Sequence, residues 1–166
     1  MKRVLVVFRG AITTADWKHT RDFNFLKAPN PIEENFKGKK DFVTFHSGFY
    51  NYIFRKRKDT NTTKYDEIVN KVIELVAMLG EDSVEIVVTG FSLGAALATI
   101  FCFYGSADSR LKKKGPIKMY TYGSPYVGGP SFAKSFRHQE LNNKIRYANF
   151  FNPDDSGKSN SQFVLL

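Results

Sequence analysis

Residues 84–100 contain a pattern that predicts a strand, a sharp turn and a helix in that order. The run Val84-Glu85-Ile86-Val87-Val88-Thr89 precedes Gly90-Phe91-Ser92-Leu93-Gly94, and Ala95-Ala96-Leu97-Ala98-Thr99-Ile100 follows it. The β-branched residues of the first run suit a strand buried in a parallel sheet. The two glycines leave room for a tight turn, and the small residues after it let a helix lie close to the sheet. Ser92 is therefore expected on a turn between a strand and a helix.

A serine in this setting is typical of the nucleophile elbow of α/β-hydrolases, where a strained turn holds the hydroxyl above the sheet. The five-residue pattern alone would occur by chance in about one random chain in 20 of this length. The interpretation as a nucleophile elbow therefore depends on the strand and the helix that flank the pattern. The simpler alternative is a strand-to-helix turn with an incidental serine. A phosphate loop is disfavoured because neither G-x-G-x-x-G nor G-x-x-x-x-G-K-[ST] is present. Ser92 is the candidate nucleophile for acyl transfer at an ester.

Length and composition indicate one globular domain over residues 1–166. Of the 166 residues 42% are hydrophobic, and these include 16 Phe and 8 Tyr, which favours a packed core over disorder. The single cysteine, Cys102, excludes an internal disulfide framework and a cysteine-based zinc site. Its apolar neighbours predict a core position.

The chain is basic, with a formal net charge of +9 and lysine and arginine clusters in residues 37–40, 55–58 and 112–114. Such clusters could attract nucleic acid or an anionic lipid surface, but solvated loops explain them more simply. No nucleic-acid-binding motif accompanies the charge, so we expect no nucleic-acid partner. The apolar run of residues 4–8 is too short for a signal peptide, and no run approaches the ~20 residues that span a bilayer. The sequence does not indicate a cellular compartment.

Strand and helix patterns alternate along the chain. We expect strands over residues 3–8, 41–45, 84–89, 117–122 and 144–151, and helices over 65–79, 93–104 and 131–138. Thr62 or Thr63 can cap the first helix and Gly80 can end it. Residues 11–40 are predicted to be an irregular lid or loop region. This order predicts a mostly parallel α/β sheet with catalytic groups beyond the carboxyl ends of its strands, where Ser92, Ala11 and residues 152–155 would lie.

Five segments resemble those of the class 3, or fungal-type, lipase family, in the same order. The elbow resembles T-G-H-S-L-G-G-A-L-A, with Phe91 for the usual His and Ala95 for the second Gly. The other four are Val7-Phe8-Arg9-Gly10 at the oxyanion-loop strand, Asp16-Trp17 at the lid-region tryptophan, Phe45-His46-Ser47-Gly48-Phe49 at V-H-x-G-F, and Thr121-Tyr122-Gly123-Ser124-Pro125-Tyr126-Val127-Gly128 at T-F-G-x-P-R-V-G.

The resemblance implies an α/β-hydrolase fold, a mostly parallel sheet flanked by helices and here incomplete at both ends. It also implies hydrolysis of acylglycerols or related carboxylic esters, with a lipid or ester as substrate and without a metal or organic cofactor. The oxyanion donors in this fold are the backbone N–H after the nucleophile, here that of Leu93, and one from an earlier loop. The matching earlier position is Ala11. The family usually has Ser or Thr there, so Ala11 keeps the backbone donor and loses an auxiliary hydroxyl.

The triad acid and base are less well matched than the nucleophile. The family has an aspartate six residues after a strand arginine, and counting from Arg146 gives Asn152, which cannot supply that charge. Asp154 is the possible substitute, and an ordinary polar loop is the alternative. The base should follow the acid, yet the three histidines, His19, His46 and His138, all precede it. Each is more simply a structural or surface residue. Loss of a triad histidine can cost about 10⁶ in kcat.

Three hypotheses follow. The first is a serine ester hydrolase of lipid metabolism, of which these residues represent the central part, as the strand at the very start of the chain suggests. The second is a catalytically inactive, lipase-like remnant that binds lipid or a protein partner. A nucleic-acid or anionic-membrane binder, suggested by the charge alone, would leave the five matching segments unexplained.

Overall fold

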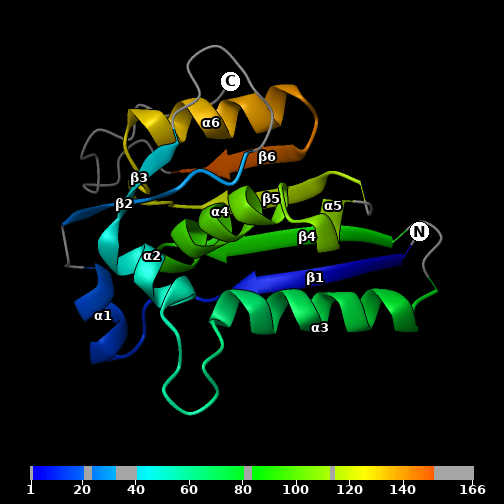
Figure 1. The fold of residues 1–166 in the computed structure, drawn as a ribbon, viewed down its shortest axis with the longest axis horizontal. Helices are drawn as coiled ribbons and strands as arrows, with labels where there is room; N and C mark the ends of the chain where they lie inside the picture. The colour runs from blue at the N-terminus through cyan, green and yellow to red at the C-terminus, as the bar shows by residue number, and fades with distance from the viewer. Residues whose placement is uncertain (1, 21–23, 33–40, 81–83, 113–114, 152–166) are drawn as a thin grey trace.

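The computed structural model describes residues 2–20, 24–32, 41–80, 84–112 and 115–151, with the backbone alone for 19, 20 and 112. Its centre is a four-stranded sheet in the order β1-β4-β5-β6 (Figure 1). The strands are β1 (Lys2–Phe8), β4 (Val84–Phe91), β5 (Ile117–Tyr122) and β6 (Ile145–Phe150), and every neighbouring pair is parallel. The predicted parallel α/β sheet is confirmed. Because all four strands run the same way, their carboxyl ends share one edge.

A second, two-stranded sheet pairs β2 (Phe25–Pro29) with β3 (Phe42–His46) in antiparallel register. β2 and α1 (Thr14–Thr20) both lie within residues 11–40, so the prediction that this region is wholly irregular was wrong. Two short helices, α2 (Ser47–Phe54) and α5 (Ser109–Lys112), were also missed. Residues 33–40 of the expected lid or loop region lie outside the described residues, and the lid role itself stays a prediction.

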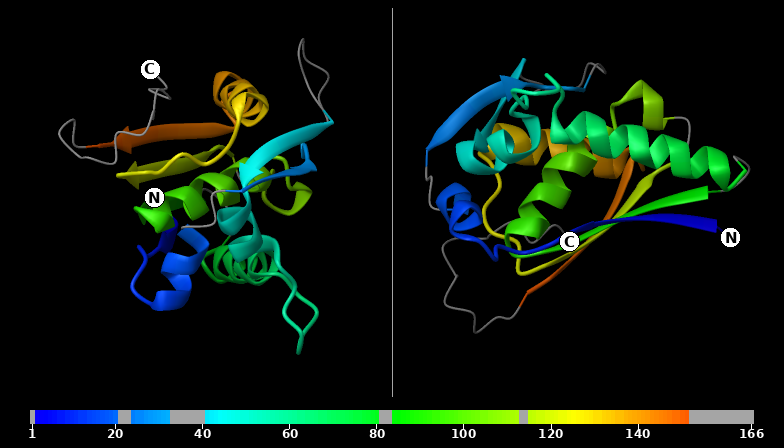
Figure 2. Two further views of the ribbon diagram at one scale, coloured as in Figure 1. Left: turned by 90° about the vertical axis from the view of Figure 1, so that its left-hand side faces the viewer. Right: turned by 90° about the horizontal axis from the view of Figure 1, so that it is seen from below.

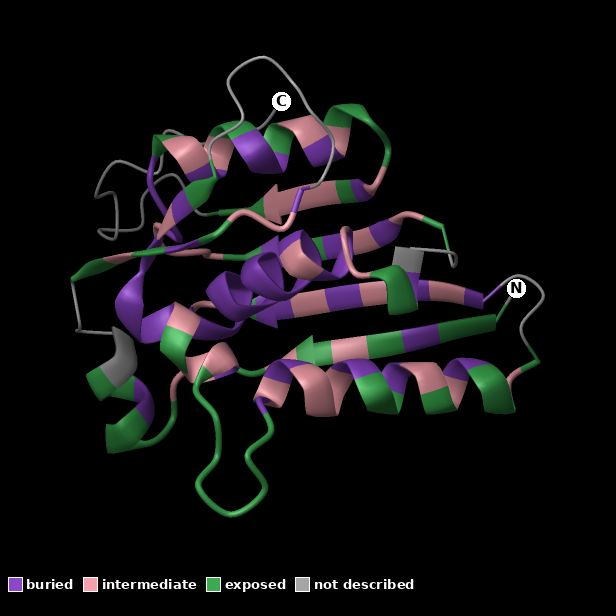
Figure 3. Ribbon diagram, in the orientation of Figure 1, coloured by how far each residue is buried: buried purple, intermediate pink, exposed green. Residues whose placement is uncertain are grey.

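Helix α4 (Leu93–Gly105) forms the centre of the core. Nearly all of its residues are buried because it packs on β1, β4 and β5, and Figure 3 shows it in the colour of buried residues along most of its length. Phe103 meets Phe45 and Phe132 with ring centroids 6.1 and 5.1 Å apart. Cys102 is fully buried, as predicted, and burial raises the pKa of its thiol. The many phenylalanines thus serve mainly to fill the layer around α4.

Helix α3 (Lys64–Met78) follows the predicted pattern closely. The hydroxyl of Thr63 accepts the Asp66 N–H at 3.0 Å and caps the first turn. Buried Val69, Val72 and Val76 recur at helical spacing on one face. Gly80 follows the helix with a φ of 75°, a conformation in which glycine avoids the Cβ clash. Helix α6 (Pro130–Leu141) extends the predicted helix at both ends.

In the described part of the chain, the helices cover one face of the four-stranded sheet. Figure 2 shows α3, α4 and α6 together on one side of the strands. The opposite face carries apolar side chains that are largely exposed, with exposed fractions of 59% for Leu5, 63% for Val7 and 63% for Phe91. At the carboxyl edge of that face, Tyr122 stacks on Phe150 with centroids 5.1 Å apart. No described helix is both long and apolar enough to serve as a membrane span.

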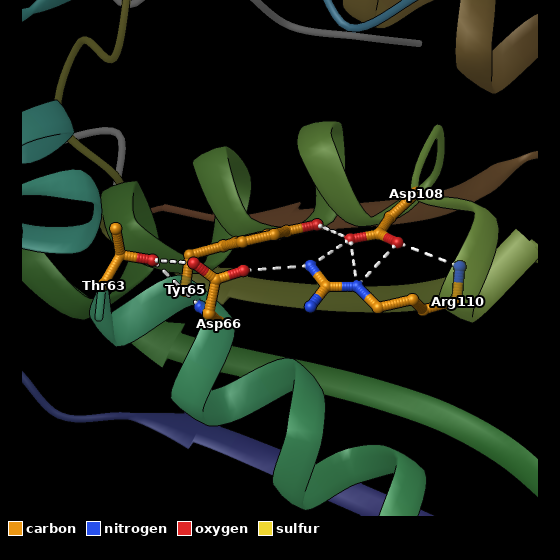
Figure 4. Close-up of polar contacts among 5 residues, drawn as sticks. All are labelled: Thr63, Tyr65, Asp66, Asp108 and Arg110. Atoms are coloured by element: carbon orange, nitrogen blue, oxygen red, sulfur yellow. Dashed lines mark hydrogen bonds and ion pairs between the residues drawn. The ribbon is translucent and has the colours of Figure 1, made fainter. Parts of the chain in front are cut away.

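An ion-pair cluster joins the start of α3 to α5 (Figure 4). The Arg110 guanidinium lies 3.1 Å from an Asp66 oxygen and 2.7 Å from an Asp108 oxygen. Tyr65 donates its hydroxyl to Asp108 at 2.9 Å. Burial would raise the pKa of Asp108, but the hydrogen bonds from Arg110 and Tyr65 outweigh it and hold that pKa below the usual value. The cluster therefore stabilises the folded state while Asp108 is ionised.

We expect Arg110→Gln to lower the free energy of unfolding by about 1–2 kcal/mol, because a half-buried carboxylate loses charged donors. The contribution is fully present above about pH 4 and is lost as the pH falls through the lowered pKa of Asp108. Urea denaturation at several pH values measures it. Lys71→Gln, which removes an exposed pair with Glu74, is the control and should cost less than about 0.5 kcal/mol. Equal losses in both variants, or a loss undiminished near pH 2, would contradict this assignment.

Candidate active site at the carboxyl edge of the sheet

Ser92 lies on the turn between β4 and α4 in a strained backbone conformation. Its φ is 53° and its ψ is −122°, a combination that costs a residue with a Cβ of order 1–3 kcal/mol. The Ser92 N–H donates to the Tyr122 carbonyl at 2.9 Å, which ties the turn to the end of β5. The side chain is partly exposed. The sequence prediction of a serine on a sharp strand-to-helix turn is therefore confirmed as geometry.

The two glycines of the turn are required by close backbone approach. A Cβ added at Gly90 would lie 2.2 Å from the Gly94 carbonyl oxygen. A Cβ at Gly94 would lie 2.1 Å from the carbonyl oxygen of Phe8 and 2.5 Å from that of Arg9. The first turn of α4 thus rests directly on the end of β1. Ala95, at the position of the family's second glycine, is fully buried.

The start of α4 presents backbone N–H groups beside Ser92. The Ser92 carbonyl accepts the N–H of Ala95 at 2.9 Å and that of Ala96 at 3.3 Å. The N–H of Leu93, the first residue of the helix, has no acceptor one turn earlier, as at any helix start. The positive end of the helix dipole adds to the positive electrostatic potential around this N–H. This arrangement can stabilise a negative oxygen held next to the Ser92 side chain.

The loop after β1 lies against the same turn. β1 and β4 are paired so that Phe8 is opposite Gly90. A Cβ added at Gly10 would approach the Phe91 ring to 3.2 Å and the Phe91 carbonyl oxygen to 3.3 Å. Ala11 is partly buried and packs on the core. The structure therefore brings Ala11 and Ser92 to one edge of the sheet, as the strand order predicts.

Asp16 organises this loop. Its side chain is only 5% exposed and lies 2.7 Å from the Arg9 guanidinium. It accepts the N–H groups of Ile12 at 3.1 Å and Thr13 at 3.0 Å, and the Tyr52 hydroxyl at 3.2 Å. The Thr13 N–H bond and the Arg9 side chain, in that order, hold the pKa of Asp16 well below its usual range. Asp16 is thus ionised throughout the neutral range.

Sequence reasoning placed Asp16 only as part of the lid-region match and missed this network. A usable signal was present, since Thr13-Thr14-Ala15-Asp16 has the spacing of a capping box. Thr13 accepts the Asp16 N–H on its hydroxyl at 3.2 Å, and the Asp16 carboxylate accepts the Thr13 N–H in return. An acidic residue at the third helical position was therefore a sign that the loop before it is fixed.

The candidate acid and base are less fully placed. Asn152 and Asp154 lie outside the described residues, as does the side chain of His19. His46 is 5% exposed and stacks on Phe49 with ring centroids 3.9 Å apart. His138 lies in the last turn of α6 beside Asn142. The side chains of His46 and His138 are thus each in contact with neighbouring residues of the fold. Within the described ranges, no group of three or more His, Cys, Asp or Glu side chains could hold a metal ion.

An apolar pocket of about 70 Å³ lies between α4, α6 and the loop that follows β5. Phe132 and Phe136 line it together with the more polar Thr99, Tyr147 and Asn149. The Asn149 side-chain oxygen accepts the Thr121 hydroxyl at 2.9 Å. Ser92 is not among the residues that line this pocket.

Comparison with known proteins indicates a family for this chain. The family model described as Lipase (class 3) matches residues 5–155. Phospholipase A1-IIgamma of Arabidopsis thaliana is 29% identical over 142 residues, covering 80% of this chain and 33% of the relative. Phospholipase A1-Igamma2, chloroplastic, of the same plant is 33% identical over 160 residues, covering 86% and 28%.

Solved structures show the same fold. A fungal lipase in complex with an inhibitor superposes with a TM-score of 0.65 at 24% identity, over 91% of this chain and 48% of that one. The chain thus spans about a third of the length of the curated relatives and about half of the solved lipase. Because the family match extends from residue 5 to residue 155, the chain belongs to the class 3 lipase family.

Proposed function

We propose that the protein hydrolyses carboxylic esters of lipids, with Ser92 as the nucleophile. The observation that carries this proposal is the strained backbone of Ser92, held by two glycines that no larger residue could replace. Strain of this kind persists where the surrounding structure imposes it, and it is typical of functional sites. Membership of the class 3 lipase family supports an ester as substrate.

In the proposed reaction the Ser92 oxygen attacks the ester carbonyl carbon and gives its proton to a base. The carbonyl oxygen becomes an oxyanion, for which the N–H groups of Leu93 and Ala11 are the proposed donors. Collapse of the tetrahedral intermediate breaks the bond to the alcohol, which leaves with a proton, and an acyl-enzyme remains. Water then attacks the acyl carbon, the bond from that carbon to the Ser92 oxygen breaks, and the fatty acid leaves while the serine regains its proton. We propose Asp154 as the acid that would orient the base, since Asn152 occupies the family position.

The substrate class is proposed from the relatives and from charge. The similar plant proteins are named phospholipases A1, which makes acyl esters of phospholipids the first substrates to test, with acylglycerols next. The net charge of +9 would draw the protein to an anionic lipid surface, at about 1 kcal/mol for each Lys or Arg near that surface. Anionic vesicles are therefore the preferred form of substrate.

We expect ester hydrolysis by the 166-residue chain to depend on Ser92 and to rise with added imidazole. The chain has no histidine after residue 138, and free imidazole can act as the base that a serine needs. Hydrolysis of p-nitrophenyl butyrate and of phosphatidylglycerol vesicles is measured for the wild type and Ser92→Ala, with and without imidazole. The variant supplies the background that imidazole itself produces.

Two results of this assay would contradict the proposal. Equal hydrolysis by the wild type and Ser92→Ala at every imidazole concentration would remove Ser92 as the nucleophile. Vesicle binding by both proteins, without any Ser92-dependent hydrolysis, would instead support an inactive lipase-like lipid binder. Vesicle sedimentation in parallel with the assay separates these two outcomes.

We also expect substitutions at Ala11 to distinguish the effect on kcat of its backbone N–H from the effect of the hydroxyl that the family usually has at this position. Ala11→Pro removes the N–H and should lower the Ser92-dependent kcat by about 10²–10³. Ala11→Ser keeps the N–H, adds a hydroxyl and should raise kcat a few-fold. Ala11→Gly keeps the donor alone and is the control, with kcat close to wild type. A kcat of Ala11→Pro equal to that of Ala11→Gly, at equal melting temperatures, would exclude Ala11 as a donor.

A further inference from the structure

We infer that Asp16 is a positioning residue, which through Arg9 fixes the direction of the Gly10–Ala11 peptide at the Ser92 elbow. This inference rests on the proposed function, because the N–H of that peptide is the proposed second oxyanion donor. Asp16 does not touch the reacting atoms in this scheme. It acts by holding the group that does.

The first step of the argument is the peptide itself. One Arg9 nitrogen, Nη1, donates both to the Gly10 carbonyl at 3.0 Å and to the Asp16 carboxylate at 2.7 Å. The Gly10 carbonyl and the Ala11 N–H belong to the same planar trans peptide, so they point in opposite directions. An arginine that holds the carbonyl on one side therefore directs the N–H to the other.

The second step is that the loop is held on both sides of this peptide. The Asp16 carboxylate binds the Arg9 side chain before the peptide and the N–H groups of Ile12 and Thr13 after it. Gly10 and Ala11 lie between these points. Gly10 alone would give the loop many conformations, and fixing both flanks removes most of that freedom. Preorganised donors are effective because they need not reorient during the reaction.

The third step is that the carboxylate is itself held by the helical layer. Asp16 is 3% exposed, so its charge depends on protein donors rather than on water. The Tyr52 hydroxyl from α2 donates to it at 3.2 Å. The Lys64 ammonium, at the start of α3, lies 3.5 Å from the centroid of the Tyr52 ring. The loop is thus attached to two helices as well as to β1.

A purely structural role, capping of α1, is the alternative that the experiment must separate. In that role Asp16 and Thr13 are two halves of one capping box and should have similar effects. In the positioning role Asp16 matters more than the Thr13 side chain, because only the carboxylate pairs with Arg9. Thr13→Ala keeps the Thr13 N–H and the Arg9 pair, and it is therefore the matched comparison.

The test measures kcat and KM for p-nitrophenyl butyrate in the Ser92-dependent assay for Asp16→Asn, Asp16→Ala, Arg9→Met, Arg9→Lys and Thr13→Ala. We expect Asp16→Ala and Arg9→Met to lower kcat by about 10–100-fold with KM within about twofold, since a displacement of 1 Å can cost 10² in rate. Arg9→Lys retains a cationic donor and should recover part of the loss. Thr13→Ala should lower kcat by at most about threefold. Glu74→Gln, on the exposed face of α3, is the control for assay variation.

Hydrogen exchange of the same variants, read by mass spectrometry, provides a result that needs no activity. We expect faster exchange in residues 9–13 of Asp16→Asn and Asp16→Ala, with β4 and α4 unchanged. Unchanged exchange in residues 9–13 would overturn the inference, as would equal kcat losses in Thr13→Ala and Asp16→Ala or an effect on KM alone. A wild type without Ser92-dependent hydrolysis would contradict the proposed function, while the exchange data would still decide whether Asp16 fixes the loop.

Discussion

The contact on which the site depends is the close approach of Gly94 to the last carbonyl groups of β1. The absent side chain lets α4 rest where a Cβ would lie 2.1 Å from the Phe8 oxygen. This approach places the start of α4 beside the loop after β1, although the two segments lie some eighty residues apart in sequence. Ser92, two residues before Gly94, has a φ of 53°. The strained turn and the approach to the loop after β1 thus lie within one short segment.

Much of this geometry could be predicted from local sequence, because it depends on residues that are neighbours in the chain. The glycines around Ser92, the Thr63 cap of α3 and the apolar run of α4 each carry their structure in a short pattern. The missed elements depend on distant partners. β2 is held by pairing with β3, where Phe25 faces His46, and α2 contains a glycine and several aromatics of weak helix propensity. Packing of buried Phe49 and Ile53 stabilises that helix instead.

Two arginine–carboxylate clusters perform different tasks in this fold. Arg110 joins α3 to α5 through Asp66 and Asp108, so its loss would loosen the contact between two helices. Arg9 joins a carboxylate to the single peptide carbonyl of Gly10, in the loop that lies against Phe91. The second specifies a direction, and a direction is lost when either partner is replaced by an apolar side chain of similar size.

The proposed chemistry divides into an electrostatic half and a proton-transfer half. In this proposal the electrostatic half consists of Ser92 with the N–H groups of Leu93 and Ala11, and all three residues are among those that the structure describes. The proposed acid, Asp154, belongs to the other half. In serine hydrolases the oxyanion donors and substrate binding alone retain about 10³–10⁴ of rate over water when a triad member is removed. A chain with only the electrostatic half would therefore still hydrolyse activated esters, in which the alcohol leaves without being protonated. Natural lipid esters have poor leaving groups and would depend far more on the base. Comparing activated esters with natural lipid esters therefore measures the electrostatic half and the proton-transfer half separately. Loosening the Arg9–Asp16 pair should affect only the electrostatic half.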